Sequence, residues 1–365
     1  MPLRFGIEEE YFVVDPVSRQ VVPRAGPVVR RAAAALGDRA STELVGTLAE
    51  AKTSPCDDLA KLTEQIRAMR AAMAAAGAAE GVRLAATGTP VLGGTRPAPI
   101  TPGARYAESL ATYRGLDDEQ CICSCHVHVE MPDRDRAVQV SNHLRPWLPT
   151  LLALAANSPY WAGRDTGHAC WRALVWARWP VAGPPPFFRS AEHYEELVGT
   201  LLECGALMDP ATVFWDVRPS ARLPTVEVRL ADVALTAEDA ALFAALVRAL
   251  VQTAAAAIDA GREAADPAPE MLRAAYWLAA RDGLGGDGVD VRTGRPARFR
   301  DLAADLLAHA RPALADNGDL DAATAGLRRL LAGGTGADRQ RAAYRRRGLL
   351  TDVVDAADLR PSGRA

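Results

Sequence analysis

Two short segments, far apart in the chain, carry acidic side chains at the spacing of a β-strand. Residues 6–10 are Gly-Ile-Glu-Glu-Glu, and residues 226–229 are Val-Glu-Val-Arg. Side chains at positions i and i+2 of a strand point to the same face, so Glu8 and Glu10 are expected on one face and Ile7 and Glu9 on the other. Two carboxylates on one face repel each other unless a cation or a basic group joins them. The pattern therefore predicts a sheet whose inner face holds metal ions.

Two further segments add potential ligands. Residues 124–130 are Ser-Cys-His-Val-His-Val-Glu, which places His126 and His128 on one face of another strand, and residues 47–52 supply Glu50. Hard divalent cations such as Mg²⁺ take oxygen ligands and often bind together with the phosphates of a substrate. A carboxylate-rich set with one or two imidazoles favours Mg²⁺ or Mn²⁺ over a structural Zn²⁺.

The cysteines offer a rival interpretation. Cys121, Cys123 and Cys125 alternate along the strand that carries His126, and such a group suggests zinc or a nucleophilic thiol. There is no matching second cysteine pair, so apolar packing is the preferred interpretation. Six cysteines are few for this length and favour free thiols in a reduced compartment.

Composition narrows the class of protein. The chain has 365 residues and a net charge of −3, about half of it is apolar and about a quarter charged, which is ordinary for a soluble enzyme. A nucleic-acid binder usually shows a basic excess, so no such partner is expected. From the sequence, we expect no signal peptide and no apolar run of the ~18 residues that a membrane span needs. A cytoplasmic protein with no membrane partner is expected, and a homo-oligomer is left open.

Nearly all the positive charge is arginine. Lys52 and Lys61 are the only lysines among 42 basic residues. A coding bias accounts for most of this, but it also means that anionic ligands must be held mainly by guanidinium groups, whose planar fork fits a carboxylate or phosphate.

The order of the expected elements predicts an α+β fold. After the first strand, extended segments are expected at 42–53, 82–90, 121–131, 212–217 and 224–230. Helices are expected at 27–36, 56–78, 105–113, 133–156 and 236–260, followed by a helical last third broken at 283–294 and 333–336. Because strands and helices do not alternate, we expect a mostly antiparallel sheet with helices packed outside it. A single catalytic domain is expected over residues 1–360, with a disordered tail at 361–365.

Seven short motifs resemble, in this order, the glutamate–cysteine ligase type 2 family of carboxylate-amine ligases. They cover nearly the whole chain, at residues 6–10, 125–129, 157–159, 166–167, 215–219, 227–229 and 334–341. Each motif alone is a weak signal, whereas seven in the right order make a specific one.

The resemblance implies a glutamine synthetase-like fold, in which a curved antiparallel sheet forms a funnel with ATP at one end and the amino-acid substrate at the other. It also implies a reaction in which ATP phosphorylates the side-chain carboxylate of glutamate, and an amine then displaces phosphate to give a γ-glutamyl amide. The chemistry agrees, because a carboxylate has no adequate leaving group until it becomes an acyl phosphate. That step needs Mg²⁺ to neutralise the ATP phosphates.

The resemblance further implies roles for individual residues. The metal ligands are expected to be Glu8, Glu10, Glu50, His126 and Glu227, with His128 touching phosphate or metal. The alternatives are an exposed strand face paired with arginines for the carboxylates and a hydrogen-bonded core pair for the histidines. The catalytic residues are expected to be Arg229, Glu227 and Arg218, where Arg229 holds the transferring phosphoryl group. The residues expected to bind the substrate are Arg172, Asn157 and Thr166.

A second anion site is expected near the C-terminus. Residues 334–341 can present backbone N–H groups at a helix start, and Thr335, Arg339 and Arg341 are expected to bind nucleotide phosphate together with Arg281. The alternative is a helix-capping turn with solvated arginines. The segment around Arg281 departs from the family, which usually carries another arginine where Leu278 stands.

The sequence leaves the amine undetermined. The family name suggests cysteine, and another amino acid or amine is an open alternative. Two other functions are kept as alternatives. One is a metal-dependent hydrolase of an amide or phosphate that uses the same carboxylates without ATP. The other is an ATP-binding regulatory protein that has lost catalysis, and the intact acidic set speaks against it.

Overall fold

A seven-stranded sheet forms the centre of the molecule. The computed structural model describes residues 2–94 and 97–359, so the predicted tail at 361–365 lies outside the described residues. The strand order is β10–β11–β5–β1–β3–β2, and β4 pairs with β1 outside this path. Every pairing in this sheet is antiparallel, and the path has two free ends, so the sheet is open. Its strands are β1 (Phe5–Val14), β2 (Ala40–Thr42), β3 (Leu48–Lys52), β4 (Arg83–Ala85), β5 (Ser124–Glu130), β10 (Val217–Pro219) and β11 (Thr225–Asp232).

One face of the sheet packs against helices and forms the larger hydrophobic core. Its strand residues, such as Phe5, Ile7 and Val127, are buried, and aromatic and β-branched side chains suit such a half-covered pleated surface. Asp58 caps the longest of the N-terminal helices by accepting a hydrogen bond from the Lys61 N–H. The helices over this face are α2 (Leu59–Ala79), α5 (Arg134–Leu144), α6 (Leu148–Leu154) and α9 (Ala237–Asp259).

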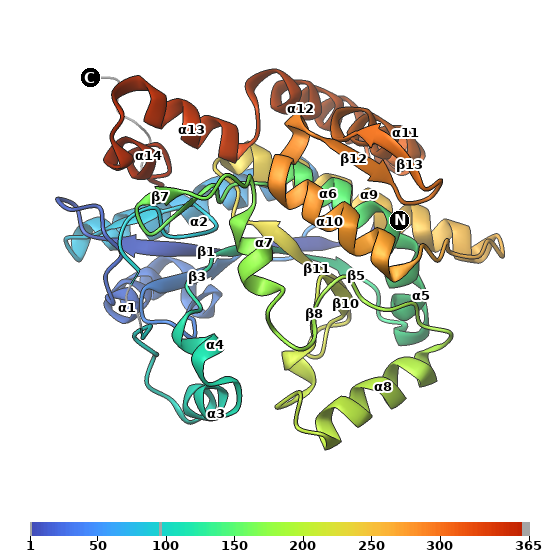
Figure 1. Cartoon of the computed structure of the whole chain (residues 1–365), viewed down its shortest axis with the longest axis horizontal. Helices are drawn as coiled ribbons and strands as arrows, with labels where there is room; N and C mark the ends of the chain where they lie inside the picture. Colours follow the sequence, from blue (N-terminus) through green and yellow to red (C-terminus); the bar gives the residue numbers. More distant parts are fainter. Residues whose placement is uncertain (1, 95–96, 360–365) are drawn as a thin grey trace.

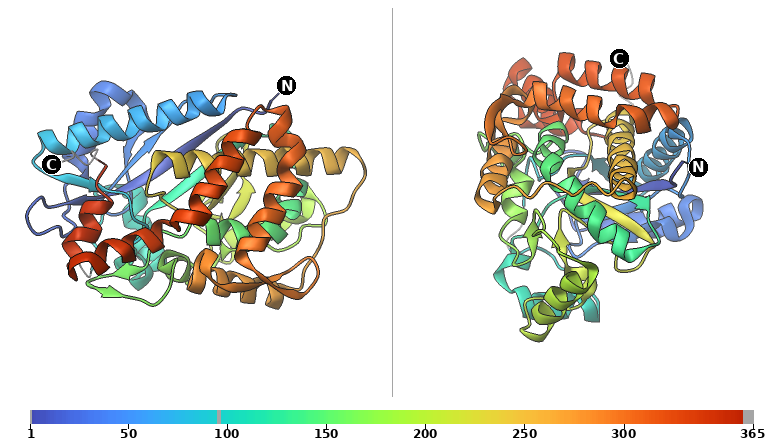
Figure 2. Two further views of the ribbon diagram at one scale, coloured as in Figure 1. Left: turned by 90° about the horizontal axis from the view of Figure 1, so that it is seen from above. Right: turned by 90° about the vertical axis from the view of Figure 1, so that its right-hand side faces the viewer.

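Helix α9 is long and apolar enough to cross a membrane, which corrects the expectation that the sequence has no apolar run of that length. Its most apolar 18-residue window has a mean hydropathy of 1.8, and 78% of that window is buried inside the molecule. The helix lies between the sheet and the C-terminal helices (Figures 1 and 2). This burial is that of a core helix.

The last third of the chain forms a helical layer on the far side of α9 (Figures 1 and 2). The break expected at 283–294 contains a short hairpin, β12 (Asp287–Asp290) with β13 (Arg295–Arg298). The helices of this layer are α10 (Pro269–Asp282), α11 (Phe299–Asp316), α12 (Leu320–Gly333), α13 (Gly336–Arg347) and α14 (Leu350–Ala356).

The other face of the sheet is flanked by shorter elements, of which α3, α4 and α8 lie below the sheet in Figure 1. Helix α1 (Ala25–Leu36) packs near the β2–β3 edge. The flanking elements are α3 (Ala104–Tyr113), α4 (Gly115–Asp118), α7 (Trp171–Trp176), α8 (Ala191–Glu203), the pair β6 (Tyr160–Trp161) and β7 (Arg164–Asp165), and the parallel pair β8 (Ala182–Gly183) and β9 (Phe214–Trp215).

The predicted α+β class is confirmed, with local differences. The helix expected at 133–156 is divided into α5 and α6 by a 3₁₀ turn at Arg145–Trp147, where Pro146 has no N–H to continue the helical hydrogen bonds. The strand expected at 82–90 ends at Ala85. The strand expected at 212–217 is divided between a 3₁₀ turn at Pro210–Thr212, β9 and the start of β10.

Candidate active site

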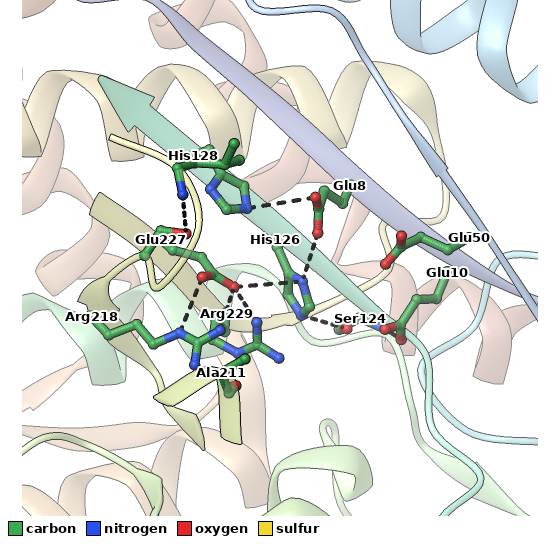
Figure 3. A network of polar contacts seen from close by, with 12 residues as sticks. Glu8, Glu10, Glu50, Ser124, His126, His128, Ala211, Arg218, Glu227 and Arg229 are labelled. Carbon is green, nitrogen blue, oxygen red and sulfur yellow. Dashed lines mark hydrogen bonds and ion pairs between the residues drawn. The ribbon is translucent and has the colours of Figure 1, made fainter. Parts of the chain in front are cut away.

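Charged side chains from five strands gather on the face of the sheet away from the large core. Glu10 lies opposite Glu50, and Glu8 lies between Lys52 and His126. Figure 3 shows Glu8, Glu10, Glu50 and His126 on this common face. We call the group the acidic cluster, and its members are Glu8, Glu10, Glu50, Lys52, His126, His128, Arg218, Glu227 and Arg229. The alternation in the sequence therefore places the predicted ligands on one common face.

Glu8 is the central carboxylate of the cluster. Its Oε2 lies 3.5 Å from Nδ1 of His126, and its Oε1 lies 3.8 Å from Nε2 of His128 and 3.4 Å from Nζ of Lys52. Burial alone would raise the pKa of Glu8, but hydrogen bonds to the two histidines outweigh it and hold that pKa well below its usual value. Glu8 is therefore an anion that stays available to a cation.

The two histidines differ in protonation. Burial, with a contribution from the Arg229 charge, lowers the pKa of His126 to about 4, so its ring is neutral near pH 7 and can offer a lone pair to a metal. Its Nε2 lies 2.8 Å from Oγ of Ser124. For His128, burial would lower the pKa, but Glu8 and Glu227 outweigh it and raise that pKa above its usual value. His128 therefore holds a proton more readily than His126 does, which suits contact with phosphate.

Glu227 is held by two arginines. Only 3% of it is exposed, and its Oε2 accepts a hydrogen bond of 3.1 Å from Nε of Arg218. Arg229 pairs with Oε1. Burial would raise the pKa of Glu227, but the charges of Arg229 and Arg218 outweigh it and hold that pKa below its usual range. The three side chains form one rigid ionic group at the β10–β11 side of the sheet.

Three acidic side chains lie close together, and one of them, Glu43, was not predicted from the sequence. Carboxylate oxygens of Glu10, Glu43 and Glu50 lie within 4.8 Å of one another. Burial, followed by the charge of Glu50, raises the pKa of Glu10 to about 7. Burial and the charges of Glu50 and Glu10 raise the pKa of Glu43 well above its usual value. A divalent cation would relieve this repulsion, so the residues present fit the predicted magnesium or manganese ion.

Two cavities open at opposite ends of the acidic cluster. Cavity A, of about 730 Å³ with part of it open to solvent, is lined at its inner end by Glu10, Glu43, Ser124, His126, Arg172 and Arg229. Cavity B, of about 710 Å³, is lined at its inner end by Glu8, Lys52 and His128, and farther out by residues that include Pro55, Leu223 and Pro224. The arrangement can hold two ligands whose reacting ends meet over the cluster.

Arg172 reaches cavity A from α7. Only 2% of it is exposed, and its guanidinium donates hydrogen bonds of 3.1 Å to the carbonyl oxygens of Leu230 and Arg229. The pairing of β11 with β5 shifts register between Val228 and Ala231, so Arg172 supports the irregular part of β11 that carries Arg229.

Six predicted site residues outside the acidic cluster line neither cavity, and these are Asn157, Thr166, Arg281, Thr335, Arg339 and Arg341. Asn157 is buried and its side-chain amide donates to the carbonyl oxygens of Ala86 and Val233. Thr166 donates to the carbonyl oxygen of Pro159, at 2.9 Å. These two residues belong to the loop that joins α6 to α7. Their predicted part in substrate binding stays a prediction.

The residues of the predicted nucleotide site have partners of their own. Thr335 caps α13 in a reciprocal capping box with Asp338, as the helix-capping alternative describes. Arg339 pairs with Asp239, and Arg341 pairs with Asp165 at 2.7 Å. The remaining member, Arg281, pairs with Asp282 at 2.6 Å and lies over the ring of Trp277. A phosphate-binding role for them stays a prediction.

The alternating thiols show no sign of reactivity. Cys121, Cys123 and Cys125 are free and buried, and burial raises the pKa of each. A nucleophilic or metal-binding thiol needs a lowered pKa. The burial and the raised pKa of these three thiols therefore fit the apolar packing that the sequence favours.

The signal for Glu43 is weak in the sequence. It lies in the loop between β2 and β3, outside any strand, seven residues before Glu50. No periodicity links it to the other acids, and only the folding of that loop over the sheet brings them together.

Comparison with known proteins places the chain. The model of glutamate–cysteine ligase family 2 matches residues 4–356. A candidate glutamate–cysteine ligase 2-2 of Mycolicibacterium vanbaalenii is 47% identical over 354 residues, which is 96% of each chain. A candidate glutamate–cysteine ligase 2-1 of Saccharopolyspora erythraea is 42% identical over 97% of this chain and 94% of its own.

Solved structures share the fold at low sequence identity. Glutamate–cysteine ligase from Francisella tularensis, in complex with AMP, has a TM-score of 0.71 at 13% identity and is matched over 98% of this chain and 88% of its own. A bifunctional glutathione synthetase from Pasteurella multocida has a TM-score of 0.69 at 14% identity, over 98% of this chain and 52% of its own. The fold and the family predicted from the motifs are therefore confirmed. The chain belongs to glutamate–cysteine ligase family 2 and is an enzyme of the carboxylate-amine ligase kind.

Proposed function

We propose that the enzyme uses ATP to phosphorylate the side-chain carboxylate of glutamate and joins it to an amine as a γ-glutamyl amide, releasing ADP and phosphate. The observation that carries the proposal is the acidic cluster lying between two cavities, with Arg229 among its members. Family membership supports the donor, and the AMP complex of the Francisella ligase supports the nucleotide.

ATP is assigned to cavity B and glutamate to cavity A. The apolar outer part of cavity B suits a nucleobase, while Lys52 and His128 at its inner end suit phosphates. Cavity A has Arg172 and Arg229 at its inner end, where a carboxylate substrate needs positive charge. The γ-phosphate and the carboxylate would then meet over Glu8 and Glu227.

Divalent cations belong between the two substrates. Mg²⁺, or Mn²⁺, would neutralise the phosphate oxygens of ATP and of the group being transferred. The chain's candidates to hold these ions are Glu8, Glu10, Glu43, Glu50, His126 and Glu227.

The arginines orient and stabilise the transfer. The substrate carboxylate oxygen forms a bond to the γ-phosphorus while the bond to ADP breaks. Arg229, held in place by Glu227, offers its free N–H groups to the transferring oxygens. The amine nitrogen then bonds to the acyl carbon, phosphate leaves with the bond electrons, and the nitrogen gives up its proton to the departing phosphate. Arg218 acts through Glu227 and is a positioning residue.

The amine acceptor is proposed as cysteine, by the family name, or another amino acid or amine. The experiment is a screen for ADP release with Mg²⁺, ATP and glutamate against a panel of amines. Release that requires both glutamate and an amine supports the ligase. Amide or phosphate hydrolysis without ATP would instead support the hydrolase, and ATP binding without turnover on any amine would support a regulatory protein.

Arg229→Ala tests the proposed role of the arginine. The expected result is a fall in kcat of about 100-fold or more, because charge stabilisation of this kind is lost in the transition state. Arg189→Ala, at an exposed position just before α8, is the matched control and should keep full activity. A change in amine KM alone would contradict the assignment.

A further inference from the structure

The outer part of cavity A contains a buried carboxylate with no cationic partner. Asp117 lies in α4, lines the cavity together with Ser109 and Gln120, and is 1% exposed. The Ser109 hydroxyl is its polar neighbour, and no basic side chain within 2–94 and 97–359 forms an ion pair with it. Arg114, with a φ of 53°, forms the sharp bend between α3 and α4 that precedes it.

The basic residues of cavity A are already engaged. Arg105 pairs with Asp209, Arg172 with carbonyl oxygens of β11, and Arg229 with Glu227. Burial raises the pKa of Asp117, the Ser109 hydroxyl lowers it, and the charge of Asp118 raises it further. A buried carboxylate without a cation is unfavourable, so the cavity has room for one positive charge that the described residues do not supply.

The neighbouring walls of cavity A are aromatic. The rings of Trp176 and Trp179 stack at 5.4 Å, and the ring of Phe214 lies 4.8 Å from that of Trp176. The indole N–H of Trp176 is also buried without an acceptor among the described residues. Aromatic faces attract cations, and an N–H donor can hold the carboxylate of an amino acid.

We propose that Asp117 binds an ammonium group of the amino substrate in cavity A and thereby determines which substrates the enzyme accepts. This inference rests on the proposed function, because it takes cavity A as the site of an amino substrate. The group must be one that does not react, since an attacking amine has to be neutral. It is either the α-ammonium of the glutamate donor or a second amine on the acceptor.

The test compares ligands that differ only in the ammonium group. Glutamate is paired with glutarate for the donor, and 1,4-diaminobutane with butylamine for the acceptor. Binding is measured by calorimetry in the presence of Mg²⁺ and a non-hydrolysable ATP analogue, with wild type, Asp117→Asn and Asp118→Asn. Asp118 is the matched control, because it neighbours Asp117 in α4 and does not line the cavity.

In one of the two pairs, wild type and Asp118→Asn are expected to bind the ammonium-bearing ligand at least about tenfold more tightly than its partner, as for a hydrogen bond to a charged group. Asp117→Asn is expected to abolish that ratio. The pair that responds identifies the source of the ammonium. Under turnover, Asp117→Asn should raise the KM of the same substrate far more than it changes kcat.

The inference fails if neither pair shows a preference in wild type, or if Asp117→Asn changes both members of a pair by the same factor. The latter result would make Asp117 a protonated packing residue. Because these ratios need no turnover, they are independent of the ligase proposal. That proposal fails separately, if wild type releases no ADP with any amine.

Discussion

At the scale of single residues, Glu43 is a candidate ligand only because its carboxylate lies close to those of Glu10 and Glu50. Glu43→Gln removes one of three carboxylates whose repulsion a cation would relieve. We expect the Mg²⁺ concentration for half-maximal activity to rise at least about tenfold, measured by metal titration of ADP release. Glu108→Gln, on the exposed face of α3, is the control. An unchanged titration curve for Glu43→Gln would exclude it from the ligand set.

Asp216 gives a prediction for the pH dependence of stability. It is buried, and burial raises its pKa from 3.8 to about 6. The folded state therefore holds a proton that the unfolded state releases, so this residue's contribution falls as the pH rises from about 4 to about 6. The loss is on the order of 3 kcal/mol.

Asp216→Asn removes this titration. The free energy of unfolding, measured with urea at pH 4 and at pH 7, should favour the variant more strongly at pH 7. A difference between variant and wild type that stays constant across this range would contradict the assignment.

At the scale of elements, the two faces of β1 differ in role, because one packs into the core and the other carries part of the acidic cluster. Glu9 points into the core, where Arg70 of α2 donates to both its carboxylate oxygens and the Tyr11 hydroxyl donates at 2.7 Å. Glu9→Gln should lower the free energy of unfolding by roughly 3–5 kcal/mol, because it leaves the Arg70 charge buried and unpaired.

Glu8→Gln, one position away on the opposite face, is the contrasting variant. It should abolish ADP release while changing the free energy of unfolding much less, because Glu8 lies on the face of the sheet that we propose binds the ligands. The free energy of unfolding from denaturant titration and the rate of ADP release, both measured on each variant, distinguish a stabilising role from a role in activity. Equal stability losses would show that the faces are not distinct in function.

Strand β1 also shows which parts of the candidate site can be predicted from the sequence. Period-two alternation places Glu8 and Glu10 together and Glu9 opposite, since strand geometry fixes the side of each residue. It does not find Glu43, whose loop acquires its place only by tertiary packing. The glycine-rich helix start predicts phosphate contacts for Arg339 and Arg341, which in the structure pair with Asp239 and Asp165. Their contact with phosphate stays a prediction. The partners of such arginines come from remote parts of the chain.

At the scale of the whole molecule, one of the close contacts between the C-terminal layer and the rest of the molecule lies at Asn157. Gln340 donates to Oδ1 of Asn157 at 2.7 Å, and a Cβ on Gly336 would lie only 2.1 Å from that oxygen. Gly336→Ala should lower the free energy of unfolding by about 1–3 kcal/mol, as overpacking does, in a urea titration. Gly333→Ala, at the end of α12 with open space around it, should be nearly neutral. Equal effects of the two variants would show that the contact is not tight.

The two lysines of the molecule differ in their chemical environment. Burial would lower the pKa of Lys52, but Glu50 and Glu8, at 2.9 and 3.4 Å from Nζ, outweigh it and raise that pKa above its usual value. Lys61 is exposed on α2, on the opposite side of the sheet. Only an unprotonated amine attacks an activated ester, so a fluorescent activated ester should label Lys61 faster than Lys52. Such a dye would lie on the face of the sheet opposite the acidic cluster. It would leave the cluster free for optical measurements of ligand binding.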